Sequence, residues 1–225
     1  MSKRVSWRME LFYFARIMYS LFRNNHFAEK LIAMKRKIEQ KLIDWKNSIN
    51  HMPLIVNGAR QIGKTYSVLE FGMKNYQNVV HINLEKNKLA AMEFEGDLSP
   101  STLVLKLESL TNERILPEKT LLFLDEIQAS ERALTSLKYF CEDAPEYHVV
   151  AAGSLLGVAV NRSNYSFPVG KVDELNMYSF GFEEFLWDLG RDMFDEEIKK
   201  NFAEAKAMSA SLHKLRLEFF YQFLI

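Results

Sequence analysis

The sequence predicts an α/β fold in which a mostly parallel sheet of about five strands carries helices on both faces, as a three-layer sandwich. Short, continuous apolar runs recur at 53–57, 120–124 and 147–152. Strands that are buried on both faces of a parallel sheet have this composition. Segments with helical character follow two of these runs, at 66–74 and 130–142. Strands that alternate with helices are typical of a parallel sheet.

The segment between the first apolar run and the first helix fits the pattern GxxxxGK[ST] of a phosphate-binding loop. Two glycines allow the backbone to approach phosphate oxygens closely, so that successive N–H groups converge on the anion. The following helix directs its positive end at the same anion. We expect Lys64 to bind the β- and γ-phosphates and Thr65 to bind Mg²⁺. The residues expected to bind nucleotide are Gly58, Ala59, Arg60, Gln61, Ile62, Gly63, Lys64 and Thr65.

The second apolar run, Thr120 to Leu124, ends in the acidic pair Asp125 and Glu126, as in a Walker-B strand. The carboxyl end of such a strand is where a doubly wound sheet presents its ligand-binding groups. We expect Asp125 to hold Mg²⁺ and Glu126 to orient and deprotonate the attacking water, which is worth about 10²–10⁴-fold in rate. The alternative for Glu126 is a surface carboxylate at a strand end. The pair follows Lys64 by 61 residues, and this position makes the two motifs together specific.

Three further strands are expected, at 78–85, at 147–152 and at 172–177. The middle one ends in Gly153 and Ser154. In ATPases with an additional strand between the two Walker strands, a polar residue at this place contacts the γ-phosphate or the attacking water. Ser154 is the candidate for that catalytic role, and a simple Gly-Ser turn is the alternative.

The residues before the loop divide into two parts. Residues 1–33 are rich in aromatic and basic side chains but are too short and too charged for a transmembrane helix. They fit either an amphipathic helix on a membrane surface or an extension translated from upstream of a true start at Met34, and we favour the second. From Met34 the sequence predicts a helix, with Ile38, Leu42, Trp45 and Ile49 on one face.

Composition narrows the class of protein. The 225 residues are 48% hydrophobic, which is enough for a sizeable core. The formal net charge is zero, so charge does not indicate nucleic acid as a partner. Cys141 is the only cysteine, which suits a reducing cytoplasm, and the five histidines do not have the spacing of metal ligands.

Taken together, these motifs resemble a family of prokaryotic AAA-type ATP-binding proteins, in which an ATPase core is followed by a C-terminal domain of uncharacterised function. The resemblance starts near Met34 and implies ATP binding, Mg²⁺-dependent hydrolysis and a P-loop fold with the additional strand. It is carried by Trp45-Lys46, the loop 58–65, Leu124-Asp125-Glu126-Ile127-Gln128, Gly153-Ser154-Leu155-Leu156 and the segment 178–186.

The chain departs from that family in three places. Lys171 follows Gly170 where the family has arginine, which keeps the charge but loses the planar fork. Met177-Tyr178-Ser179-Phe180 replaces Pro-Leu-Ser-Phe. The C-terminal segment 212–225 is crowded with apolar side chains. We therefore expect the chain to be a C-terminally truncated member of this family that lacks the second domain. We expect an extension at 1–33, the core at 34–186 and a helical segment at 187–225.

The leading hypothesis is an ATPase core coupled to an unknown partner. ATP is preferred over GTP because the chain lacks an Asn-Lys-x-Asp motif for the base. A small-molecule kinase is a second enzymatic hypothesis, but the Asp125-Glu126 pair favours water as the acceptor of the phosphoryl group. A nucleotide-gated binding module with little turnover and a non-functional fragment remain alternatives. Self-association could supply an arginine finger, for which spacing does not choose among Arg60, Arg132 and Arg162.

Overall fold

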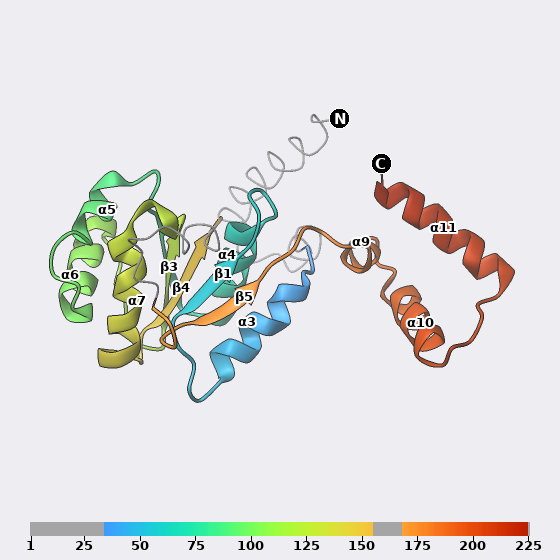
Figure 1. The fold of residues 1–225 in the computed structure, drawn as a ribbon, viewed down its shortest axis with the longest axis horizontal. Coiled ribbons are helices and arrows are strands. Elements are labelled where there is room, and N and C mark those ends of the chain that lie inside the picture. The colour runs from blue at the N-terminus through green and yellow to red at the C-terminus, as the bar shows by residue number, and fades with distance from the viewer. Residues whose placement is uncertain (1–33, 155–167, 225) are drawn as a thin grey trace. The chain divides into compact units, whose positions relative to one another are not determined.

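A parallel sheet lies at the centre of the fold (Figure 1). The computed structural model describes residues 34–154 and 168–224. Its strand order is β2-β3-β4-β1-β5, and every pair of neighbours is parallel. β4 therefore lies between β3, which carries the acidic pair, and β1, which precedes the phosphate loop. The predicted α/β sheet with its additional strand is confirmed. The strands are β1 (Leu54–Asn57), β2 (Asn78–Asn83), β3 (Thr120–Asp125), β4 (His148–Gly153) and β5 (Asp173–Asn176).

Helices connect the strands and continue beyond the last one. Ser130 starts α7 by accepting a hydrogen bond from the Ala133 N–H over 3.1 Å, and Pro100 occupies the first turn of α6. Before β5, the described residues form the helices α3 (Lys37–Asn47), α4 (Lys64–Asn75), α5 (Lys88–Glu93), α6 (Pro100–Thr111), the short 3-10 helix η1 (Ile127–Ala129) and α7 (Glu131–Asp143). Those after it are α9 (Phe182–Asp188), α10 (Asp192–Ala203) and α11 (Ala210–Leu224).

Two hydrophobic cores cover the two faces of the sheet. Successive side chains of a strand point to opposite faces, so Leu122 and Leu124 of β3 enter one core while Leu121 and Phe123 enter the other. Figure 1 shows α5, α6 and α7 grouped on one side of the sheet. The first core adds Leu103 and Leu107 of α6 with Leu134, Leu137 and Phe140 of α7. The second adds Ile38, Leu42 and Trp45 of α3 with Val68 and Phe71 of α4.

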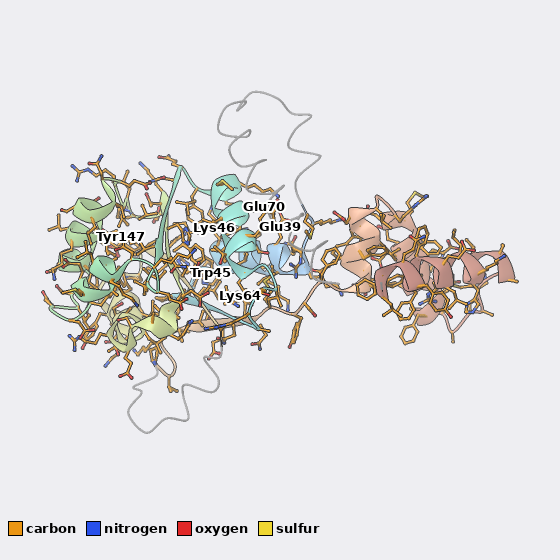
Figure 2. All side chains as sticks on the ribbon, turned by 90° about the horizontal axis from the view of Figure 1, so that it is seen from above. Glu39, Trp45, Lys46, Lys64, Glu70 and Tyr147 are labelled. Carbon is orange, nitrogen blue, oxygen red and sulfur yellow. The ribbon has the colours of Figure 1, made fainter. Side chains whose placement is uncertain are left out.

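Helices α3 and α4 are also joined by charged side chains. The Lys74 ammonium of α4 lies 2.8 Å from Glu39 of α3 and 3.0 Å from Glu70 of its own helix. Figure 2 labels both carboxylates near the contact between the two helices. All three side chains are partly exposed, so this cluster adds little stability beyond the apolar contact beneath it.

One sequence-based expectation for α3 is wrong. The spacing predicts Ile49 on the same helix face as Trp45, but Ile49 is 97% exposed whereas Trp45 is buried. The reason is that the helix ends at Asn47 and Ser48 is extended, so the helical spacing no longer applies. The turn is fixed instead by the Trp45 indole, which donates a hydrogen bond to Met52 O over 2.8 Å.

Helices α5 and α6 lie between β2 and β3, and α10 and α11 follow α9. Phe182 of α9 packs against Phe220 and Phe223 of α11, with ring centroids 5.4 and 5.7 Å apart. The expectations for residues 1–33 lie outside the described residues. Within the described part of the chain, no helix has both the length and the apolarity to cross a bilayer.

Candidate nucleotide-binding site

The predicted site residues gather at the carboxyl edge of the sheet. The loop that follows β1 leads directly into Lys64, the first residue of α4 (labelled in Figure 2). Asp125 is the last residue of β3, and Ser154 directly follows β4. Because these three parallel strands are neighbours, their ends bring the loop, the carboxylates and the serine together.

The loop needs its two glycines for space. A Cβ atom at Gly58 would lie 2.5 Å from Met177 O, so the β5 end packs directly on the loop backbone. Gly63 has a left-handed φ of 92°, and a Cβ there would lie 3.2 Å from Arg36 Nη1. Gln61 is also left-handed, with φ 62°. Alternating backbone conformations of this kind turn peptide N–H groups toward a common centre, as an anion-binding loop requires.

Lys64 is held over this loop. Its ammonium donates to Gly58 O over 2.9 Å and to Ala59 O over 2.6 Å, and only 8% of the residue is exposed. Burial lowers the pKa of Lys64, whereas the nearby Glu126 and Asp125 carboxylates raise it, and the balance is a lowered pKa. The side chain is therefore folded back on the loop backbone.

Asp125 is the centre of a polar cluster. Its Oδ2 accepts from the Thr65 hydroxyl at 3.1 Å, from Asn83 Nδ2 at 3.2 Å and lies 3.3 Å from His81 Nε2. Burial raises the pKa of Asp125, but the hydrogen bonds from His81, Thr65 and Asn83 outweigh it, so the net pKa is lowered. The carboxylate is therefore charged at neutral pH and lies beside the hydroxyl that ends the loop.

Glu126 follows in a left-handed conformation, with φ 53° and ψ 47°. Its N–H donates to Asp125 Oδ1 over 3.1 Å, which fixes the turn at the end of β3. The Gln128 side-chain amide donates to Glu126 Oε2. A non-glycine residue in this conformation is uncommon and costs energy, and such positions concentrate at functional sites.

Ser154 is tied to the loop by Arg60. Arg60 Nε donates to Ser154 Oγ over 3.3 Å, and Ser154 is only 2% exposed. Of the other arginines considered as a finger, Arg132 donates to Phe94 O and Gly96 O, and Arg162 lies outside the described residues. The structure therefore brings Ser154 to the phosphate loop, while its contact with a γ-phosphate stays a prediction.

Several contacts of the site escaped the sequence reading. Asn83 and His81 belong to β2, where Asn83 is in register with Asp125. Both are polar residues near the carboxyl end of a predicted strand, and this pattern could have indicated that they belong to the site. Gln128 belongs to one of the motifs that carry the family resemblance, but the sequence analysis assigned it no role in the site. Arg36, which contacts the loop at Ile62 O, had no local signal.

The donor set suits Mg²⁺ bound together with nucleotide. Mg²⁺ prefers oxygen ligands and usually takes one or two from the protein, with the rest from phosphates and water. Thr65 and Asp125 provide a hydroxyl and a charged carboxylate side by side. Among the residues that the structure describes, no group of three or more His, Cys, Asp or Glu could hold a metal alone. The chemistry of these donors thus fits the ion without a dedicated protein cage.

Comparisons with known proteins bear on the family of this chain. A comparison with curated proteins finds no match. Among solved structures, Caenorhabditis elegans PCH-2 has a TM-score of 0.38 at 11% identity, covering 91% of this chain. The Aeropyrum pernix ORC1 protein, solved in complex with DNA, has 0.42 at 14% identity, covering 76%. This chain spans half the length of each. The AAA domain matches residues 50–186, which hold the loop, the acidic pair and Ser154, and the chain therefore belongs to the AAA domain family.

Proposed function

We propose that this protein binds ATP and hydrolyses it to ADP and phosphate with Mg²⁺, coupled to a partner that remains to be identified. The observation that carries the proposal is the 3.1 Å contact between the Thr65 hydroxyl and the Asp125 carboxylate, beside the loop that holds Lys64. Phosphoryl transfer depends mainly on positioning and on charge stabilisation, and these residues supply both.

Each residue has a distinct role in this proposal. The N–H groups of residues 58–65 and the Lys64 ammonium bind the phosphates. Thr65 and Asp125 would hold Mg²⁺, which when bound neutralises charge on the β- and γ-phosphates. Glu126 accepts a proton from the attacking water, and Ser154 contacts that water or the γ-phosphate. The lowered pKa of Asp125 keeps its carboxylate charged for this work.

A nucleotide-gated binding module is the second candidate function. The specific observation in its favour is that the Lys64 ammonium is bound by the loop carbonyls of Gly58 and Ala59. Hydrolysis then requires this contact to rearrange, or requires an arginine from a second copy. Under this alternative the protein binds ATP tightly and releases phosphate slowly.

The test is ATP binding and phosphate release by the full chain with Mg²⁺, beside Lys64→Ala and Glu126→Gln. Lys64→Ala should abolish binding, while Glu126→Gln should bind ATP and stop phosphate release. Lys74→Ala is the matched control, because this lysine lies on the same helix α4 and forms its ion pairs within the described residues with Glu39 and Glu70. Wild-type binding without phosphate release supports the module. Hydrolysis by Glu126→Gln at the wild-type rate contradicts the role of Glu126 as base.

A further inference from the structure

A single buried guanidinium connects the phosphate loop to the segment after β5. Arg36 directly precedes α3 and is only 7% exposed. Its Nη1 donates to Ile62 O, its Nη2 to Tyr178 O and its Nε to Glu184 Oε1, each over 3.0 Å. All three nitrogens of the planar group are therefore used, and each contacts a different part of the chain. A lysine ammonium carries its three donors on one nitrogen, so it lacks the planar fork with which Arg36 reaches these three acceptors.

The contact at Ile62 O acts on the peptide that leads into Gly63. In a trans peptide the C=O and the N–H point in opposite directions. Holding Ile62 O on the Arg36 side therefore directs the Gly63 N–H to the other side of the peptide, where under the proposed function it can donate to a phosphate oxygen. The fit is close, because a Cβ at Gly63 would lie 3.2 Å from Arg36 Nη1.

Glu184 holds the arginine from α9. Its Oε1 accepts from Arg36 Nε and from the Lys37 N–H at 2.8 Å, so the carboxylate also binds the start of α3. Its Oε2 accepts from the Gly181 N–H at 2.8 Å, which caps α9. Burial raises the pKa of Glu184, but its hydrogen bonds outweigh this and lower it, so the pair is charged and buried. Removing either member leaves the other buried without its partner, which is strongly unfavourable.

We propose that Arg36 is a positioning residue of the phosphate loop, that Glu184 holds it in place, and that nucleotide binding is thereby coupled to the start of α9. The proposal rests on the proposed function, since the ligand of the loop is ATP. Arg36 touches the loop backbone and acts through it. By reciprocity, ATP binding at the loop must stabilise the Arg36–Glu184 pair to the extent that the pair favours ATP.

Two measurements on the full chain test this. The first is the Kd of Mg-ATP for wild type, Arg36→Lys and Glu184→Gln. The second is hydrogen exchange of segments 58–65 and 181–186, with and without ATP. Loss of a hydrogen bond to a charged group predicts a Kd raised by about 10- to 100-fold in both variants. Exchange at 58–65 should be faster in both without nucleotide, and ATP should slow exchange at 181–186 in wild type but not in Arg36→Lys.

The control is Asp195→Asn, which removes another buried carboxylate that accepts from Trp187 Nε1 and Lys199 Nζ within the C-terminal helices. It should lower the melting temperature and leave the Kd for ATP unchanged. A folded Arg36→Lys with wild-type Kd overturns the positioning role. If wild type binds no ATP, the proposed function is wrong. Hydrogen exchange at 58–65 without nucleotide then still tests whether Arg36 orders the loop. Exchange in Arg36→Lys at the wild-type rate would overturn the positioning role.

Discussion

Asn83 donates a hydrogen bond to Asp125 Oδ2 over 3.2 Å, across the neighbouring strands β2 and β3. The two residues end their strands in register, so the backbone pairing itself brings the amide to the carboxylate. Thr65 reaches the same oxygen from α4. The carboxylate that we assign to Mg²⁺ is therefore oriented by two elements before any ligand is bound.

Asn83→Ala should raise the pKa of the Asp125 carboxyl in the protein without Mg²⁺ and nucleotide. Burial raises the pKa of Asp125, and the hydrogen bonds that accompany it keep the pKa lowered. Removing one donor shifts the balance toward the protonated acid, so the charged form is lost at a higher pH. The measurement is the NMR chemical shift of the Asp125 carboxyl carbon against pH. Asn78→Ala at the start of the same strand, where Asn78 contacts Glu113, is the control. An unchanged pKa of Asp125 in Asn83→Ala would show that this hydrogen bond does not tune Asp125.

Gln128→Ala should lower kcat by about tenfold and leave the Kd for ATP unchanged. The Gln128 amide donates to Glu126 Oε2, and no hydrogen bond joins it to the loop among the described residues. Its loss therefore disturbs the orientation of Glu126 and not the binding of phosphate. Single-turnover phosphate release beside equilibrium ATP binding separates the two effects. A weaker Kd with unchanged kcat would place Gln128 in the binding site instead.

The sheet and the loop could be predicted because their signals are local. The run Thr120–Asp125 is buried along its whole length. Its apolar composition alone predicts this burial, without knowledge of the neighbouring strands. Gly58 and Gly63 stand at spacings that the loop needs for close packing. Asp125, Glu126 and Ser154 then follow from the rule that ligand groups lie at the carboxyl ends of parallel strands.

The features that the sequence analysis missed are long-range contacts or depend on where one helix ends. Arg36 meets its partners 26, 142 and 148 residues later in the chain, so its neighbours give no hint of its role. Ile49 continues the apolar spacing of α3, but Ser48 ends the helix first. Periodicity describes a helix face only while the helix lasts, and the end of α3 has no strong stop signal such as glycine or proline.

Gly72→Ala should destabilise the fold by about 1–3 kcal/mol, although alanine is the better helix former. A Cβ at Gly72, inside α4, would lie 2.6 Å from Val79 Cγ2 and 2.9 Å from Leu121 Cδ2. The helix therefore lies too close to the sheet for a methyl group. Urea unfolding measures the change. Gly96→Ala is the control, because its Cβ would meet only Lys106 Nζ at 3.4 Å.

Adding Val79→Ala should recover part of the stability lost in Gly72→Ala, since it removes the side chain that the new methyl group meets first. If Gly72→Ala is as stable as wild type, the close approach of α4 to the sheet at this point is wrong. If Val79→Ala gives no recovery, the conflict lies with Leu121 instead.

His148 should make stability depend on pH in the mildly acidic range. It begins β4, is 7% exposed, and lies with Nδ1 2.7 Å from the Tyr76 hydroxyl. Burial, with help from His51 and Lys46, lowers the pKa of His148 from 6.5 to about 4. As pH falls below 6.5 the unfolded chain binds a proton that the folded chain refuses. Stability is therefore full above pH 6.5 and declines toward pH 4, by about 3 kcal/mol.

The measurement is the free energy of unfolding between pH 4.5 and 7.5. Asp125 and Glu184 have lowered pKa values, so most of their contribution is lost at pH values below this window, and only the start of the Glu184 loss falls at its acidic end. His148→Gln, which can still hydrogen-bond to Tyr76, should flatten the decline, whereas His213→Gln on the exposed surface of α11 should leave it as in wild type. A decline of the same slope in His148→Gln would assign the pH dependence to another group, because a side chain that cannot titrate cannot produce it.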